Sequence, residues 1–168
     1  NIVGVAKAYC TRVGSGPFPT ELLDDMGEQL RKNGNEFGAT TGRPRRCGWQ
    51  DLVALKYSCM INGFSHIALT KLDVLSGIDE LWICVAYEID GKEVTEFPAN
   101  LKSLESAKPV YKKFYGWKED ISQAKTIEEL PINAQAYIKF ITDFVKVPYC
   151  VISVGTDRTE TIVLEQVF

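Results

Sequence analysis

The chain has one histidine, His66, among its 168 residues, and its five cysteines include no Cys-x-x-Cys pair. Structural zinc sites are built from closely spaced cysteines and histidines, so we expect no metal ligands of that kind. Five widely spaced cysteines fit reduced thiols better than a disulfide framework. His66 opens an apolar stretch with no carboxylate or cysteine near it in the sequence. We therefore expect a structural or surface role for His66, not that of a catalytic base.

Segments that cross membranes or cradle phosphates are lacking as well. No apolar run reaches the roughly 18 residues that span a bilayer, and there is no signal-peptide or lipidation motif. The nucleotide-binding motif Gly-x-x-x-x-Gly-Lys-Ser/Thr does not occur. A net charge of −3 argues against general binding to nucleic acids or anionic membranes, so neither is an expected partner.

The composition is that of a folded protein, with 45% hydrophobic and 24% charged residues. These fractions are sufficient for an apolar core, so we expect the chain to be folded and not disordered. The length suits one globular domain, which we predict to span residues 1–168. Because the first residue is Asn1 rather than Met, and strand-like sequence follows at once, we expect the chain to be cut from a larger protein.

The pattern of apolar residues and turn signals predicts a mixed α and β fold, of the α/β class. Strands are expected at 2–9, 66–70, 80–89, 149–155 and 158–164, with a hairpin turn at Asp90-Gly91 and short β-like pieces within 92–118. Helices are expected from about 20 to 33, from about 49 to 61, and from 133 to 146. Thr126 and Glu129 form a capping box that predicts one further short helix.

Each long helix has a predicted buried face, set by apolar residues three or four positions apart. The face of the first helix consists of Leu22, Leu23, Met26 and Leu30. That of the second consists of Trp49, Leu52, Val53, Tyr57 and Met60. The face of the third, which has the clearest pattern, consists of Tyr137, Phe140, Ile141, Phe144 and Val145.

Residues 39–46, ATTGRPRR, carry three arginines on an acidic chain. Guanidinium groups are permanently charged and match carboxylates and phosphates with a planar fork of donors. The loop begins at Ala39. Thr40 and Thr41 add hydroxyl groups, and Gly42 allows a ligand to approach the backbone closely. A solvated charged loop is the alternative. Pro44 favours a binding role, because it stiffens the segment around Arg43 and Arg45, and a merely solvated loop does not need stiffness.

Two further segments lie at predicted strand ends, where open α/β sheets bind their ligands. Lys71-Leu72-Asp73 follows one strand, and the Asp73 carboxylate could accept two N–H bonds from a guanine base, which adenine cannot donate. Taken alone, the segment is better interpreted as a strand end at which the Asp73 side chain caps the following turn than as a guanine site. Ser153-Val154-Gly155 ends another strand and could offer N–H groups to a base carbonyl, although by itself it reads as a turn.

Taken together, these stretches resemble the adenylosuccinate synthetase family. The resemblance rests on seven segments in the family's order: GVAKAYCTRVGSGPFPTE (4–21), FGATTGRPRRCGWQDLVALKY (37–57), LTKLDVLSGIDE (69–80), CVAYE (84–88), KPVY (108–111), GW (116–117) and ISVGTDR (152–158). The combination of TRVGSGPFPTE with TTGRPRRCGW is highly specific.

The resemblance implies a GTP-dependent ligase of purine (AMP) synthesis that joins IMP and L-aspartate, giving adenylosuccinate, GDP and phosphate. It implies that residues 39–45 close on aspartate, with Arg43 also reaching IMP and Arg45 reaching GTP. Lys71, Leu72 and Asp73 would read guanine, and Ser153, Val154 and Gly155 would complete that pocket.

The chain would be the C-terminal domain of this fold, a relative of P-loop GTP-binding proteins. The family's phosphate loop, catalytic residues and Mg²⁺ ligands would lie upstream, so no catalytic residue is expected here. The family is cytoplasmic and usually homodimeric. The isolated chain is expected to be inactive, and a non-catalytic guanine-nucleotide-binding module remains the alternative.

Overall fold

The computed structural model describes residues 1–167, which form two compact units. The first, here called the sheet unit, comprises Asn1–Ala8, Ala54–Leu81 and the chain from Lys113 onward. The second, the loop unit, comprises Tyr9–Val53 and Trp82–Lys112. The assignment of all these residues to a single domain stays a prediction. No helix among the described residues is long and apolar enough to cross a membrane.

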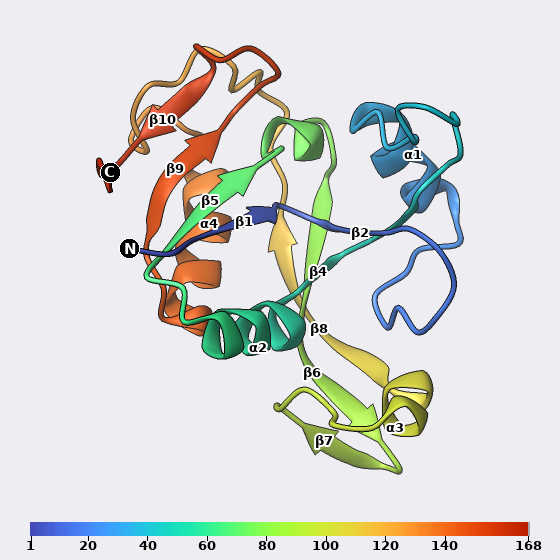
Figure 1. Ribbon diagram of the computed structural model, residues 1–168. Coiled ribbons are helices and arrows are strands. Elements are labelled where there is room, and N and C mark those ends of the chain that lie inside the picture. Colours follow the sequence, from blue (N-terminus) through green and yellow to red (C-terminus); the bar gives the residue numbers. More distant parts are fainter. Residues whose placement is uncertain (168) are drawn as a thin grey trace. The chain divides into compact units, whose positions relative to one another are not determined.

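The sheet unit is built on four strands in the order β1-β5-β9-β10 (Figure 1). Their bounds are β1 Val3–Lys7, β5 His66–Thr70, β9 Tyr149–Ser153 and β10 Thr161–Val163. The first three are parallel, and β10 runs antiparallel to β9. Helix α4, Ile132–Val145, covers one face of this sheet, and most of α2, Leu52–Asn62, belongs to the same unit (Figure 1).

Alternate residues of these strands point to opposite faces of the sheet, as strand geometry requires. Ile67, Leu69 and Ile152 lie on the buried face. The other face carries a row of cross-strand partners, Val5, Ala68, Val151 and Val163. Val5 is 76% exposed and Val163 is 66% exposed, so the described residues leave this apolar row uncovered. Parallel sheets are normally covered on both faces.

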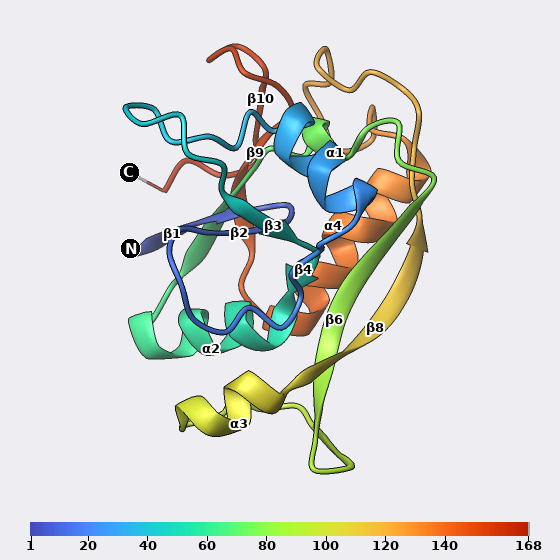
Figure 2. The same ribbon diagram turned by 90° about the vertical axis from the view of Figure 1, so that its right-hand side faces the viewer.

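The loop unit is assembled from shorter elements, several of which are seen in Figure 2. Strands β2 and β3 pair antiparallel, β4 pairs with β6, and β7 and β8 also pair with β6. Strands β6 and β8 continue into the sheet unit. The bounds are β2 Cys10–Arg12, β3 Arg46–Gly48, β4 Gln50–Asp51, β6 Glu80–Ile89, β7 Lys92–Val94 and β8 Lys108–Tyr115; the helices of this unit are α1 Asp25–Asn33 and α3 Leu101–Ser106.

The strongest sequence patterns are confirmed. Helix α4 and strands β5, β6 and β9 lie within a few residues of their predicted ranges. In α4 the predicted stripe faces inward, with Tyr137, Ile141 and Val145 buried. The clear period of 3.6 residues explains this success, because only one face of such a helix can be buried favourably.

The beginnings of the first two helices were predicted wrongly. Helix α1 starts at Asp25 because the Asp24 side chain accepts a hydrogen bond from the Gly27 N–H and caps the helix, so Leu23 precedes it and is 91% exposed. Helix α2 starts at Leu52, because the residues before it form β3 and β4. Met60, predicted to be buried, is 69% exposed.

Other short elements also differ from the expectation. The predicted helix at the Thr126 capping box is a series of turns, in which Glu129 accepts from the Lys125 N–H at 2.7 Å. Helix α3 was not predicted, and the expected strand at 2–9 ends at Lys7, with β2 beginning at Cys10. Elements this short have too few residues for a periodic pattern to identify them.

The Tyr137 hydroxyl fastens α4 to the residue after β1, because it donates a hydrogen bond of 2.7 Å to the Ala8 carbonyl in a buried setting. We expect Tyr137→Phe to lower the free energy of unfolding by about 1 kcal/mol, the typical value of such a bond. Urea denaturation measures this loss. An unchanged midpoint with an unchanged slope would show that the bond contributes nothing.

Candidate functional site

The arginine loop, residues 39–46, forms the tip and one arm of a tight hairpin in the loop unit. Phe37 bridges to Pro44, and the Gly38 N–H donates to the Arg43 carbonyl at 2.9 Å. The Gly42 N–H donates back to Gly38, and Gly42 has a φ of +64°, a left-handed conformation that glycine adopts without strain. The hairpin bonds hold the exposed tip, Ala39–Gly42, in one conformation.

The three arginines of the loop have different surroundings. The Arg45 Nη1 lies 2.7 Å from the Glu36 carboxylate, which is fully buried and also accepts from the Tyr9 hydroxyl at 2.6 Å. Arg46 forms a two-pronged ion pair with Glu21. The guanidinium of Arg43 is exposed and has no ion pair with any described residue. Of the three, therefore, only Arg43 presents a charge that the fold does not neutralise.

A pocket of about 170 Å³ lies beside this loop. Its lining combines the hairpin with the segment after β2, and consists of Arg12, Val13, Gly14, Gly38, Thr41, Arg43, Pro44, Arg45 and Arg46. The volume suits a small anion better than a nucleotide, whose sites usually exceed about 300 Å³. Guanidinium groups and a hydroxyl in such a pocket are suited to a carboxylate or a phosphate.

The two predicted strand-end segments lie together in the sheet unit. Since β5 and β9 are parallel neighbours, their carboxyl ends meet at the same edge of the sheet. The Leu72 N–H donates to the Ser153 carbonyl at 3.3 Å, which joins the two segments directly. Lys71 turns the chain sharply with a φ of +62°, and a short 3₁₀ helix, Asp73–Leu75, follows. This places Asp73 at the sheet edge.

Asp73 has a carboxylate oxygen, Oδ1, that is buried and has no hydrogen bond among the described residues. Burial raises the pKa of Asp73; nearby Lys71 opposes the shift, and the charges of Glu160 and Asp120 add to it. A buried carboxylate oxygen without a donor is costly, so such groups are nearly always satisfied. A ligand that supplies N–H donors would satisfy this oxygen and favour its ionised form.

The second segment already uses part of its bonding capacity. The Val154 N–H donates to the Glu160 carbonyl at 3.0 Å, and the Ser153 hydroxyl donates to the Gly155 carbonyl at 3.0 Å. The Gly155 N–H, by contrast, has no hydrogen-bond partner in the described part of the chain. A Cβ at Gly155 would lie 2.1 Å from Glu160 Oε2, so a larger residue here would displace the Glu160 side chain.

His66 belongs to neither of these segments. Its Nε2 is 3.1 Å from the Glu165 carboxylate and its Nδ1 is 3.0 Å from the Ser65 hydroxyl. The expected structural or surface role agrees with these contacts, although the carboxylate partner is 99 residues away and was not visible in the local sequence. Across residues 1–167, no cluster of three or more His, Cys, Asp or Glu side chains could hold a metal ion.

Sequence reasoning missed the residues that support the arginine loop. Tyr9, Arg12 and Glu21 were noticed only as part of a family segment, and Glu36 was not singled out at all. The one local signal was the run of glycines and prolines after Arg12, which predicts an ordered loop.

Comparisons with known proteins identify the family of this chain. The family model described as adenylosuccinate synthetase matches residues 1–162. The chain belongs to the adenylosuccinate synthetase family. The match confirms the resemblance inferred from the sequence segments. Adenylosuccinate synthetases are ligases of AMP synthesis.

Full-length relatives are much longer than this chain. The synthetase of Carboxydothermus hydrogenoformans is 56% identical over 167 residues, which cover 99% of this chain and 39% of that protein. That of Myxococcus xanthus is 53% identical over 99% of this chain and 38% of its own length. A structure titled as fully ligated adenylosuccinate synthetase from Plasmodium falciparum superposes with a TM-score of 0.93 at 48% identity, covering 98% of this chain and 40% of that one.

Proposed function

We propose that this chain is the part of an adenylosuccinate synthetase that binds L-aspartate and reads the guanine base of GTP. The complete enzyme would join IMP and L-aspartate, with GDP and phosphate as the other products. The observation that carries the proposal is the buried, unpartnered Oδ1 of Asp73 at a sheet edge shared with Ser153–Gly155.

The Asp73 carboxylate suits guanine because the base presents two N–H donors side by side on its Watson–Crick edge. Adenine presents one donor and one acceptor there, so a carboxylate discriminates between the two bases. The free Gly155 N–H on the neighbouring strand end can donate to the guanine carbonyl. Lys71 and Leu72 hold Asp73 in place through the left-handed turn and the bond to Ser153.

The arginine loop suits L-aspartate because its pocket is small and the Arg43 charge is uncompensated. One carboxylate of aspartate would bind Arg43, and the Thr40 and Thr41 hydroxyls at the hairpin tip can donate to the other. Arg45 bonds Glu36 through Nη1 alone, so its other N–H groups remain for the side of the site that holds GTP. Holding the dicarboxylate and the nucleotide in a fixed arrangement is the main contribution that binding residues make to such a reaction.

The chemistry of phosphoryl transfer is assigned to residues that this chain does not contain. Mg²⁺ would stabilise charge on the transferring phosphoryl group. Among residues 1–167 there is no cluster of three or more His, Cys, Asp or Glu side chains that could hold the ion, and we assign its ligands to the rest of the complete enzyme. Cytoplasmic location and a homodimeric state, both usual in the family, are part of the proposal.

The 168-residue chain by itself is expected to make no adenylosuccinate, because it spans about 39% of its full-length relatives. The test incubates the pure chain with IMP, L-aspartate, GTP and Mg²⁺ and follows adenylosuccinate by absorbance. A full-length synthetase that carries these residues serves as the positive control. Turnover by the isolated chain would refute the assignment of phosphoryl transfer to residues outside it. An inactive full-length protein that binds GTP would favour the alternative, a non-catalytic guanine-nucleotide-binding module.

A further inference from the structure

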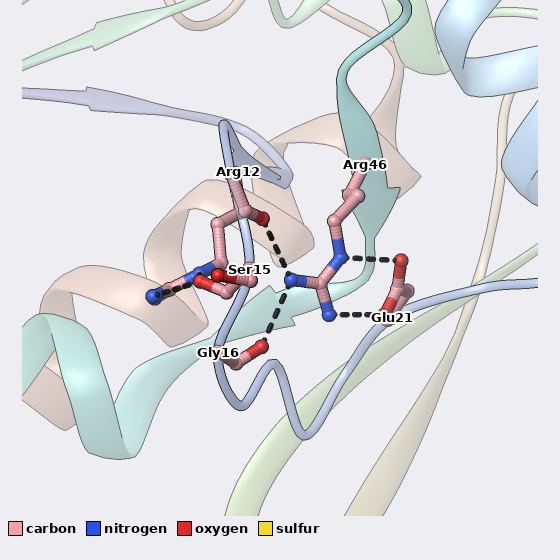
Figure 3. Close-up of polar contacts among 6 residues, drawn as sticks. Arg12, Ser15, Gly16, Glu21 and Arg46 are labelled. Carbon is pink, nitrogen blue, oxygen red and sulfur yellow. Dashed lines mark hydrogen bonds and ion pairs between the residues drawn. The ribbon is translucent and has the colours of Figure 1, made fainter.

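The turn Gly14-Ser15-Gly16 has all three of its carbonyl groups held by arginine side chains (Figure 3). Arg46 Nη1 donates to the Gly14 carbonyl at 3.1 Å and to the Gly16 carbonyl at 2.8 Å. Arg12 donates to the Ser15 carbonyl from Nε at 3.2 Å and from Nη2 at 2.9 Å. The turn is exposed, so these side chains, not burial, hold it in place.

Arg46 is itself anchored by Glu21 at the far end of the same loop. Its Nε and Nη2 donate to the two Glu21 oxygens at 2.7 and 2.5 Å, and its guanidinium lies 5.5 Å from the centre of the Phe18 ring. The hydrogen bond from Arg46 lowers the pKa of Glu21, and the same bond raises the pKa of Arg46. All three guanidinium nitrogens of Arg46 are engaged, and its charge is neutralised.

The two glycines give this turn wide backbone freedom, which the arginine bonds restrict. Gly14 has a φ of +82° and Gly16 a φ of +107°, conformations that glycine adopts but that cost it much backbone entropy. A Cβ at Gly16 would lie 2.5 Å from Arg12 Nη2, so a side chain at this position would displace the Arg12 guanidinium that bonds to Ser15.

One residue of this turn, Gly14, lines the arginine-loop pocket. Arg12, Val13 and Gly14, from the segment after β2, line the pocket together with residues of the hairpin, among them Gly38, Thr41 and Arg43. Arg46 belongs to β3, so it connects the strand that leaves the arginine loop to the turn opposite it. A single side chain therefore joins the two segments that line the pocket.

We propose that Arg46 and Glu21 are a positioning pair that holds the Gly14–Gly16 turn and so fixes the position of Gly14 in the lining of this pocket. Arg46 also lines the pocket, but all of its guanidinium nitrogens donate within the fold, so it acts through the turn and not by binding the ligand, in contrast to Arg43. The inference rests on the proposed function only in taking L-aspartate as the ligand. It assigns roles to Arg46 and Glu21 in addition to those of residues 39–45.

The first test measures the turn in the 168-residue chain by ¹⁵N relaxation and amide exchange. We expect Arg46→Met to lower the order parameters of residues 14–16 to below about 0.6, the range of flexible backbone, while the amides of β5 and α4 are unchanged. Glu21→Gln, which keeps a neutral partner, should have a smaller effect. Lys139→Met is the control, because Lys139 makes an exposed ion pair with Asp143 on α4. A turn that stays ordered in Arg46→Met overturns the proposal.

The second test measures kinetics in a full-length synthetase that carries these residues. Arg46→Met should raise the KM for aspartate about tenfold, the equivalent of one lost hydrogen bond, with a small change in kcat. Arg46→Lys should recover little, because an ammonium group cannot replace the fork on Glu21 and the two carbonyl contacts together. An unchanged KM with a disordered turn would overturn the positioning role. If the wild-type enzyme fails to use aspartate, the proposed function fails, and the relaxation test still decides whether Arg46 holds the turn.

Discussion

Asp73→Asn in a full-length synthetase carrying these residues is expected to weaken GTP binding about thirtyfold, equivalent to about 2 kcal/mol. The amide keeps one acceptor oxygen, and its NH₂ group would face a guanine donor. One good hydrogen bond is therefore lost and one repulsive contact is added. Sites built around buried hydrogen bonds reject mismatched ligands far more strongly than apolar pockets do.

The same substitution should improve the use of xanthosine triphosphate, whose base has a carbonyl where guanine has its amino group. The NH₂ group of the introduced amide could donate to that carbonyl, so the nucleotide preference should shift toward the xanthine base. The measurement compares kcat/KM for both triphosphates in wild type and variant, with Asp143→Asn, an exposed carboxylate on α4, as the control. The constants for IMP and aspartate should hardly change. An unaltered nucleotide preference would mean that Lys71–Asp73 is only a strand-end turn.

Arg43→Leu is expected to lower kcat/KM for aspartate by about 10- to 150-fold while leaving the fold intact. The range corresponds to about 1.5–3 kcal/mol, the cost of losing a hydrogen bond to an ionised partner. The fold should tolerate the change because the Arg43 side chain is exposed and has no ion pair with described residues, unlike Arg45 with Glu36.

Steady-state kinetics at varied aspartate concentration, together with a thermal melt, tests this prediction. Lys102→Leu removes an exposed positive charge on α3 and provides the matched control. A near-normal rate at ordinary aspartate concentrations would identify the loop as solvated surface. A large drop in melting temperature would instead assign Arg43 to the support of the fold.

Local sequence patterns predicted well those elements in which the spacing of apolar residues, or the β propensity of the residues, is clear within the element itself. Helix α4 has five apolar residues on one face, and strand β6 is rich in β-branched and aromatic residues, which favour these two elements. The start of α1 could not be predicted in this way. Apolar spacing favoured a start near Thr20, but the Asp24 cap satisfies the N–H of Gly27 and begins the helix later.

The sequence by itself determined the family, because seven specific segments occur in order, and it identified Arg43, Asp73 and Gly155 as candidates for binding. Only the tertiary structure decided which candidates are available to a ligand. Glu36 and Glu21 neutralise Arg45 and Arg46 across 9 and 25 residues, whereas Arg43 has no such partner among the described residues and Asp73 Oδ1 is left buried without a donor from them. Charge compensation depends on which side chains approach within a few ångströms after folding, and spacing along the chain does not report that distance.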